Sequence, residues 1–186
     1  MRVFLLASFP SLSLRDPAPL RLEELLTRCA THLSKEEMDE LDAVCSLPPE
    51  GNSPFARRWA AAWQELNQLN VQQRARRLPP DQIPSLPPGK PLRFPMLQDA
   101  VAAAWEAPDP LRREMDLLLA QWGWLEDIRR AEPYSSADLC AYALQLKLLE
   151  QRDAWKEEAG AVQFEEQTKT FLSPVLDDLF PKESIA

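Results

Sequence analysis

Glycine, histidine and long apolar runs are scarce in this chain of 186 residues, which has four glycines and one histidine, His32. Four scattered glycines cannot build the Gly-x-x-x-x-Gly-Lys loop that cradles phosphates. One histidine without a Cys-x-x-Cys pair argues against a zinc site. No stretch approaches the ~20 apolar residues of a membrane span. We therefore expect no metal, no cofactor and no direct membrane span.

Cysteine is also sparse. Cys29, Cys45 and Cys140 are too widely spaced for a disulfide framework or a zinc pattern. We expect reduced side chains in the core of a cytoplasmic protein. Residues 1–10 include a short apolar run, but one basic residue precedes it and no clear cleavage site follows. We expect this segment to belong to the fold rather than to a signal peptide.

The charge of the chain is uneven. Its net charge is −8, and residues 1–78 hold ten basic and ten acidic side chains. Residues 79–186 hold eleven basic and nineteen acidic ones, so they carry the whole excess. Phosphate binding rests on clustered Lys and Arg, so we expect no nucleic-acid partner.

Proline is abundant and clustered. The eighteen prolines leave four uninterrupted windows, at residues 20–47, 55–78, 111–132 and 134–173. Proline inside a helix removes a hydrogen bond and clashes with the preceding turn, so it marks helix ends. The chain therefore reads as helices joined by proline-stiffened loops.

The first window indicates two helices. Apolar residues recur at helical spacing within residues 20–33. Ser34 and Glu37 then form a capping box, which predicts the start of a short second helix. Strand-like alternation appears only at residues 2–6.

The second window predicts a helix over residues 55–78. It opens with Ser53 and Pro54, a cap residue followed by proline at the first helical position. It closes with Arg74, Arg76 and Arg77. These cations suit the negative end of a helix dipole and could also hold an acidic partner.

Residues 79–95 contain seven prolines, which predicts a stiff extended connector. A short helix is expected next, over residues 96–107. Asp109 and Pro110 repeat the cap-then-proline signal before a helix over 111–132. The heptad stripe of that helix comprises Leu111, Met115, Leu118, Trp122 and Leu125.

The last window predicts a helix over residues 136–160 or beyond, capped by Ser135 or Ser136. Its two apolar stripes indicate burial on two sides and a central position. Gly123, inside the preceding helix, costs about 1 kcal/mol relative to Ala, and the close approach of a neighbouring helix would explain it.

These patterns predict an all-α helical bundle with a long antiparallel hairpin in the C-terminal half. We expect one domain in four parts. They are an N-terminal helical part at 1–78, the proline-rich connector at 79–95, the hairpin at 96–172 and an acidic tail at 173–186.

Few residues of the chain are candidates for catalysis. His32 lies near a helix end, where an imidazole is usually solvated. Four carboxylates on the long helices could in principle form acid–base pairs, although charges on a helix usually face solvent. They are Glu114, Glu126, Asp127 and Glu150. We therefore predict no catalytic residue.

Aromatic and basic residues provide the candidates for partner binding. Trp59, Trp63, Trp122 and Trp155 fit the apolar stripes, so core packing is expected for them. Trp105 and Trp124 fit less well, and one of them is a candidate exposed interface anchor. The full candidate set is Arg74, Arg76, Arg77, Trp105 and Trp124.

Four segments carry short motifs in a fixed order, at residues 4–12, 25–41, 59–78 and 109–150. The first includes Ala7-Ser8-Phe9-Pro10, and the last includes Ala141-Tyr142 and Leu146-Lys147-Leu148-Leu149-Glu150. In order and spacing they resemble a bacterial family of unknown function. The genes of that family typically lie within operons for V-type rotary ATPases.

This resemblance implies a non-catalytic ATPase component or accessory factor in ion transport. It further suggests similarity to the helical C (d-type) subunit, which links the central stalk to the membrane ring. The implied partners are V-type ATPase subunits of the stalk or the ring. The implied location is the cytoplasm, with any association with the inner membrane made through a partner.

Three functions are therefore hypotheses. The first is a coupling or accessory subunit of a V-type ATPase. The second is a free-standing assembly factor or adaptor that uses the same surfaces transiently. The third is an enzyme, which would require carboxylates on facing helices to converge in a pocket.

Overall fold

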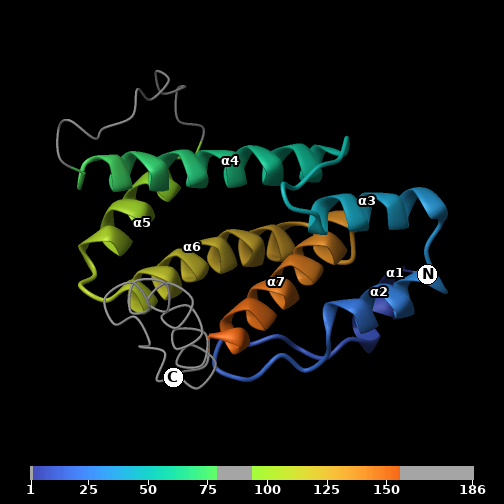
Figure 1. The fold of residues 1–186 in the computed structure, drawn as a ribbon. Helices are drawn as coiled ribbons and strands as arrows, with labels where there is room; N and C mark the ends of the chain where they lie inside the picture. Colours follow the sequence, from blue (N-terminus) through green and yellow to red (C-terminus); the bar gives the residue numbers. More distant parts are fainter. Residues whose placement is uncertain (1, 79–93, 156–186) are drawn as a thin grey trace, which may run out of the picture. The chain divides into compact units, whose positions relative to one another are not determined.

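A computed structural model describes residues 2–78 and 94–155. These residues form helices and no strand, which confirms the all-α prediction (Figure 1). The helices are α1 (Arg2–Ser8), α2 (Leu22–Ala30), α3 (Lys35–Cys45), α4 (Pro54–Ala75), α5 (Pro95–Glu106), α6 (Pro110–Ala131) and α7 (Ser136–Ala154). Nearly all of the predicted connector and the whole acidic tail lie outside the described residues.

The chain divides into two compact units, residues 1–150 and residues 151–186. The first unit contains α1 to α6 and α7 as far as Glu150. The second unit is described only at residues 151–155, of which 151–154 complete α7 and include an ion pair of 2.5 Å between Arg152 and Asp153. None of the helices in the described ranges combines the length and apolar character that a membrane crossing requires.

Three predicted helix starts are confirmed. Ser34 Oγ accepts the Glu37 N–H at 3.3 Å, and the Glu37 carboxylate accepts the Ser34 N–H at 2.9 Å. Ser53 Oγ caps α4, and the Asp109 carboxylate caps α6, each directly before a proline at the helix start. For α7 the cap is Ser135, whose Oγ accepts a backbone N–H at 3.0 Å. Short-range hydrogen bonds of this kind can be predicted from the sequence because both partners lie within one helical turn.

The strand suggested at residues 2–6 is wrong, because these residues belong to α1. Leu5, Leu6 and Phe9 are buried whereas Phe4 is exposed. Leu5 and Leu6 are neighbours on the buried side of α1, and Phe9 follows directly after its last residue. A short apolar run does not distinguish a strand from a helix by periodicity alone.

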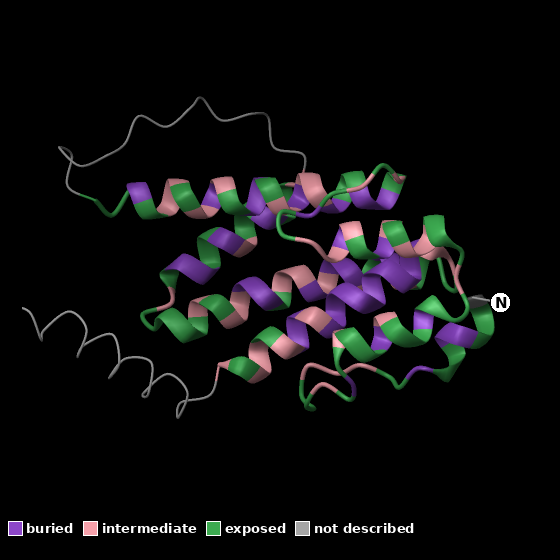
Figure 2. Ribbon diagram, turned by 45° about the vertical axis from the view of Figure 1, so that its right-hand side comes forward, coloured by how far each residue is buried: buried purple, intermediate pink, exposed green. Residues whose placement is uncertain are grey.

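The central position predicted for the last long helix is confirmed. Every side chain of α7 from Ala137 to Leu146 is buried, and Figure 2 shows this burial extending around the helix. Both predicted stripes therefore pack against neighbours. Burial on all sides of this stretch means that its side chains are covered around the whole circumference of the helix.

Two charged side chains of α7 close the ends of neighbouring helices. Glu150 Oε1 accepts the N–H of Leu22 at 2.8 Å, at the start of α2, where Arg21 offers no side-chain cap. Lys147 Nζ donates to the carbonyl oxygen of Cys45 at 2.5 Å, at the end of α3. An anion at a helix N-terminus and a cation at a C-terminus both match the helix dipole.

The predicted hairpin is not confirmed as a packing unit. The most extensive backbone contacts are between α5 and α6 and between α4 and α5, and α6 and α7 diverge from the turn that joins them (Figure 1). Glu65 of α4 accepts the Phe94 N–H at 3.0 Å, which ties the start of α5 to α4. The short helix α5 therefore makes more extensive backbone contact with α6 than α7 does.

The reason given for Gly123 is wrong. A Cβ placed on Gly123 would have no neighbour within 4 Å, so no close helix approach requires glycine there. Leu111, the first residue of the predicted α6 stripe, is exposed, whereas Leu118, Trp122 and Leu125 are buried. The stripe is therefore correct only from the second turn of the helix onwards.

Candidate functional site

An open groove of about 470 Å³ lies beside the turn between α6 and α7. Residues 6–7 and 9–11 line one side of it, and the end of α6, the turn and the start of α7 line the other. Polar and apolar side chains contribute to its walls in similar measure. It is the first of two places where the described structure gathers chemically distinctive groups.

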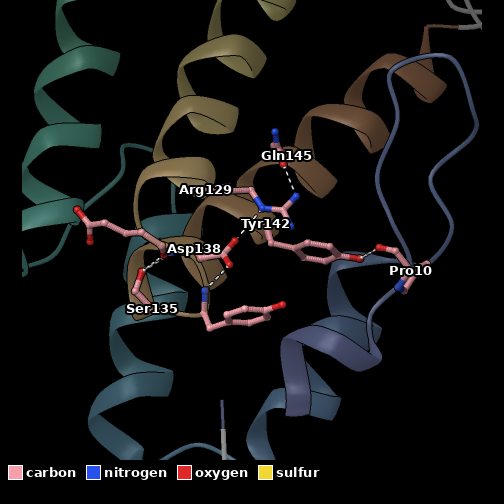
Figure 3. Close-up of polar contacts among 8 residues, drawn as sticks. Pro10, Arg129, Ser135, Asp138, Tyr142 and Gln145 are labelled. Carbon is pink, nitrogen blue, oxygen red and sulfur yellow. Dashed lines mark hydrogen bonds and ion pairs between the residues drawn. The ribbon is translucent and has the colours of Figure 1, made fainter. Parts of the chain in front are cut away.

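The polar groups of this groove form one connected network (Figure 3). Arg129 Nε donates to Asp138 Oδ1 at 2.8 Å, and Arg129 Nη1 donates to Gln145 Oε1 at 2.9 Å. The second oxygen of Asp138 accepts the Tyr134 N–H at 2.8 Å. Asp138 and Gln145 are both buried. A buried carboxylate requires such partners, so the network holds the end of α6 on α7.

Tyr142 connects the network to the N-terminal segment. Its hydroxyl donates to the Pro10 carbonyl oxygen at 2.9 Å, and its ring stacks on Phe9 with centroids 5.3 Å apart. The Arg129 guanidinium lies 5.0 Å from the same ring. Burial raises the pKa of Tyr142 to about 12, so its hydroxyl stays protonated at neutral pH.

The groove offers a surface rather than a reaction centre. Arg129 and Asp138 are engaged with each other, and at the rim Arg130 pairs with Glu126 at 2.5 Å. Tyr142 holds its proton against a carbonyl oxygen. A catalytic site needs a nucleophile beside a base, or an acid and base facing one substrate position. Among the described residues of this groove no such pair occurs.

The four carboxylates considered for acid–base chemistry do not converge. Glu114 is exposed, and Glu126 and Asp127 both pair with Arg130, at 2.5 and 3.8 Å. Glu150 serves as the cap of α2. Their positions match the ordinary expectation for charges on helices.

The cysteines and the histidine show no sign of a reactive site. Cys29 and Cys140 are buried and Cys45 is partly buried, as expected for core side chains. Burial raises the pKa of Cys29 and of Cys45 to about 11, and that of Cys140 still further. His32 is exposed. Within the described ranges, no group of three or more potential ligands could hold a metal ion.

The second distinctive place surrounds Trp105, at the end of α5. The Arg77 guanidinium lies 4.9 Å from the centre of its ring and donates a hydrogen bond to its carbonyl oxygen. The Arg113 guanidinium, from the first turn of α6, lies 4.1 Å from the same ring. The indole Nε1 donates to Asn70 Oδ1 at 2.8 Å. We call Arg77, Arg113 and Trp105 the arginine–tryptophan site.

The expectation that Trp105 or Trp124 is an exposed anchor is wrong, because both are buried, at 6% and 7% exposure. Trp124 stacks with Trp59 at 5.6 Å and with Phe55 at 6.4 Å, and it meets Phe94 edge-on at 6.1 Å. Rings from α4, α6 and the start of α5 thus form one cluster. Aromatic rings give a helix bundle large buried area, which explains why both indoles lie inside.

The predicted arginines differ in their contacts. Arg74 and Arg76 are exposed at the end of α4, whereas Arg77 reaches Trp105. Arg113 did not stand out in the sequence although it completes this site. One signal was present, because Arg112 and Arg113 place two cations in the first turn of α6, where the helix dipole disfavours them.

Comparison with family models, with curated proteins and with solved structures finds no match to this chain. The resemblance to a family encoded beside V-type ATPases therefore stays a prediction from sequence.

Proposed function

We propose that this protein is a non-catalytic helical interaction protein, and more specifically a coupling or accessory subunit of a bacterial V-type rotary ATPase. One observation carries the first part. The polar side chains gathered in the groove are engaged with one another or with backbone groups, as Arg129, Asp138 and Tyr142 illustrate. Polar side chains that already hold helices together are not available for catalysis, whereas the surface that they form is open to a partner.

The ATPase setting rests on the ordered sequence motifs. The structure adds that the first and fourth motif segments touch, through Tyr142 and Pro10. Lys147 and Glu150, the two charges of the fourth segment's last motif, both act as helix caps. The motifs thus correspond to contacts that maintain the fold. Membership of the family rests on the motifs themselves, and the function comes from the operon setting of the family that they resemble.

Co-purification tests the proposal. The tagged full-length protein is isolated from gently solubilised native membranes and from the soluble fraction, and bound proteins are identified against an untagged control. We expect V-type ATPase subunits in fixed stoichiometry with the protein. We also expect no ATP hydrolysis by the purified protein, because a nucleoside triphosphate needs a phosphate cradle.

The same experiment separates the hypotheses. Substoichiometric ATPase subunits, present only during assembly, would favour an assembly factor or adaptor. If no ATPase subunit is enriched in either fraction, the ATPase assignment is withdrawn and an unassigned helical adaptor is left. Sustained turnover by the purified protein would instead support an enzyme.

A further inference from the structure

In the arginine–tryptophan site two positive charges lie against one aromatic ring, and no described carboxylate pairs with either of them. Arg77 and Arg113 come from different elements and both lie within 5 Å of the Trp105 ring centre. Glu106 and Glu114 are the acids adjacent to the site in sequence. Neither forms an ion pair with these arginines, and no other described carboxylate does.

The contrast with Arg112 is informative. Arg112 precedes Arg113 and pairs with Asp116 at 3.2 Å, as is usual for a charge on a helix. Arg113 instead has its Nε atom buried without any hydrogen-bond partner. This one nitrogen has lost water without gaining an acceptor, which is unfavourable for a charged group, while the Arg113 side chain as a whole is half-buried.

A desolvated cation gains more from an incoming anion than a hydrated one does, because less water must be removed when the anion binds. Guanidinium groups match carboxylates in a planar, two-bonded geometry. Arg74 and Arg76 are exposed next to the site and add positive charge. The whole chain carries a net charge of −8, so this local excess of arginine opposes the general trend.

The geometry points to the arginine–tryptophan site as the docking point for a carboxylate-rich segment of a partner protein. This inference rests on the proposed function, since it names the chemistry of the partner that an interaction protein would hold. A protein segment is favoured over a nucleic acid because two guanidinium groups match one or two carboxylates, whereas binding of a phosphate backbone rests on a larger cluster of Lys and Arg. Trp105 is buried, so the guanidinium groups, rather than the indole, meet the partner.

The test measures binding of a fluorescein-labelled peptide of ~10 glutamates to the full-length protein. Fluorescence anisotropy is recorded at ~0.05 and ~0.15 M salt. We expect saturable binding that weakens with salt. Arg77→Gln and Arg113→Gln should each reduce affinity about tenfold, because each removes one charged donor from the site.

Arg112→Gln is the matched control. It removes the same charge one residue away, from a side chain paired with Asp116 rather than resting on Trp105. We expect less than about a twofold change. Arg113→Lys keeps the charge but loses the planar fork, so an intermediate loss of about threefold is expected. Circular dichroism checks that every variant keeps its helices.

Three results would overturn the inference. They are the absence of peptide binding, equal losses for Arg112→Gln and Arg113→Gln, and tighter binding of a labelled oligothymidylate of equal length. The result is independent of the co-purification experiment. If the peptide binds but no ATPase subunit co-purifies, the site is kept and its partner is a different protein. If ATPase subunits co-purify but the peptide does not bind, the ATPase proposal is kept and its contact surface lies elsewhere.

Discussion

The successive helices α6 and α7, of 22 and 19 residues, use their polar side chains in opposite ways. On α6 the charged groups pair mainly within the helix, as Arg112 does with Asp116 and Arg130 with Glu126. On the buried part of α7 they reach other elements, as Lys147 and Glu150 show, and only beyond Glu150 does a described pair, Arg152 with Asp153, form within the helix. Local pairs on an exposed helix contribute only a few tenths of a kcal/mol. A buried helix has few solvated positions, so its polar groups must find partners elsewhere and thereby organise the fold.

Arg129 and Arg113 are exceptions on α6. Arg129 leaves its own helix to bind Asp138 and Gln145 of α7, and Arg113 lies over the Trp105 ring of α5. The contrast between the two helices can be tested by substitution.

The largest effect is expected in the core. Leu146 of α7 and Leu118 of α6 are 0% and 2% exposed. Changing either one to alanine should lower the free energy of unfolding by about 2–5 kcal/mol, because the change leaves a cavity. Leu119→Ala, at a position 46% exposed, is the control and should change it by less than about 0.5 kcal/mol. Urea unfolding measures all three, and near-neutral values at both core positions would contradict the packing.

Next comes the buried polar network. Asp138→Asn removes the charge that accepts from Arg129 and Tyr134, and should cost about 2–3 kcal/mol of stability. Glu126→Gln breaks a more exposed ion pair of α6 and should cost less than about 0.5 kcal/mol. Equal costs in urea unfolding would show that the two helices do not differ in this way.

A third prediction concerns alkaline pH. The pKa of Tyr142 rises by burial from 10.0 to about 12. The neutral phenol therefore contributes fully to stability below about pH 10, and this contribution is lost as the pH rises through the folded pKa. The loss should reach about 1.4 kcal/mol at about pH 11.

Tyr142→Phe isolates this effect. The variant should lose less stability than the wild type between about pH 8 and pH 11, because it has no phenol to ionise. The three cysteines titrate in both proteins, so their contribution cancels in the difference. Urea unfolding measures the stability of both proteins at each pH. Equal losses of stability in the two proteins would rule out ionisation of Tyr142 as the cause.

The caps supplied by α7 should have a smaller effect. Glu150→Ala leaves the Leu22 N–H without its acceptor and should cost about 1 kcal/mol. Arg21 occupies the N-cap position of α2, so Arg21→Ser can supply a local cap. A serine at position 21 would accept the N–H of Glu23 or Glu24, whereas Glu150 accepts that of Leu22, so we expect the two changes to be additive. A double-mutant cycle by urea unfolding measures the coupling, and a coupling above about 0.5 kcal/mol would contradict separate acceptors.

The smallest expected effect is a gain in stability. Gly123→Ala on α6 should stabilise the protein by about 0.5–1 kcal/mol, because the site has room for a Cβ and alanine favours the helix. Gly51→Ala is the opposite case. Its φ is +126° and an added Cβ would lie 2.7 Å from that of Ala56, so it should destabilise by about 1–3 kcal/mol. Thermal unfolding distinguishes the two signs.

Much of the secondary structure was predictable, and the two sites much less so. The starts of α3, α4 and α6 follow from cap residues beside prolines or a capping box. Only part of the arginine–tryptophan site could be predicted from the sequence, namely Arg77 at the end of α4. Its other half, Arg113, depends on how α5 brings the first turn of α6 towards the end of α4, and no local pattern encodes that orientation.

The groove network shows the same limit. Arg129, Asp138 and Gln145 could be read only as charges or polar groups on helices. Which of them are buried depends on the angle between α6 and α7, and a heptad stripe predicted a closer hairpin than the structure has. Burial then decides which polar groups pair and which face solvent.

The sequence by itself determined where α3, α4 and α6 begin, because a cap and its target N–H lie within about four residues of each other. It also determined that α7 is central, because two apolar stripes require two packing partners. Only the tertiary structure decided that Tyr142 meets Pro10, that Glu150 caps α2, and that two arginines converge on Trp105. The first two of these contacts join residues more than 100 positions apart, and the third joins three helix ends. They form only when whole helices pack, so their energy depends on geometry that no short segment contains.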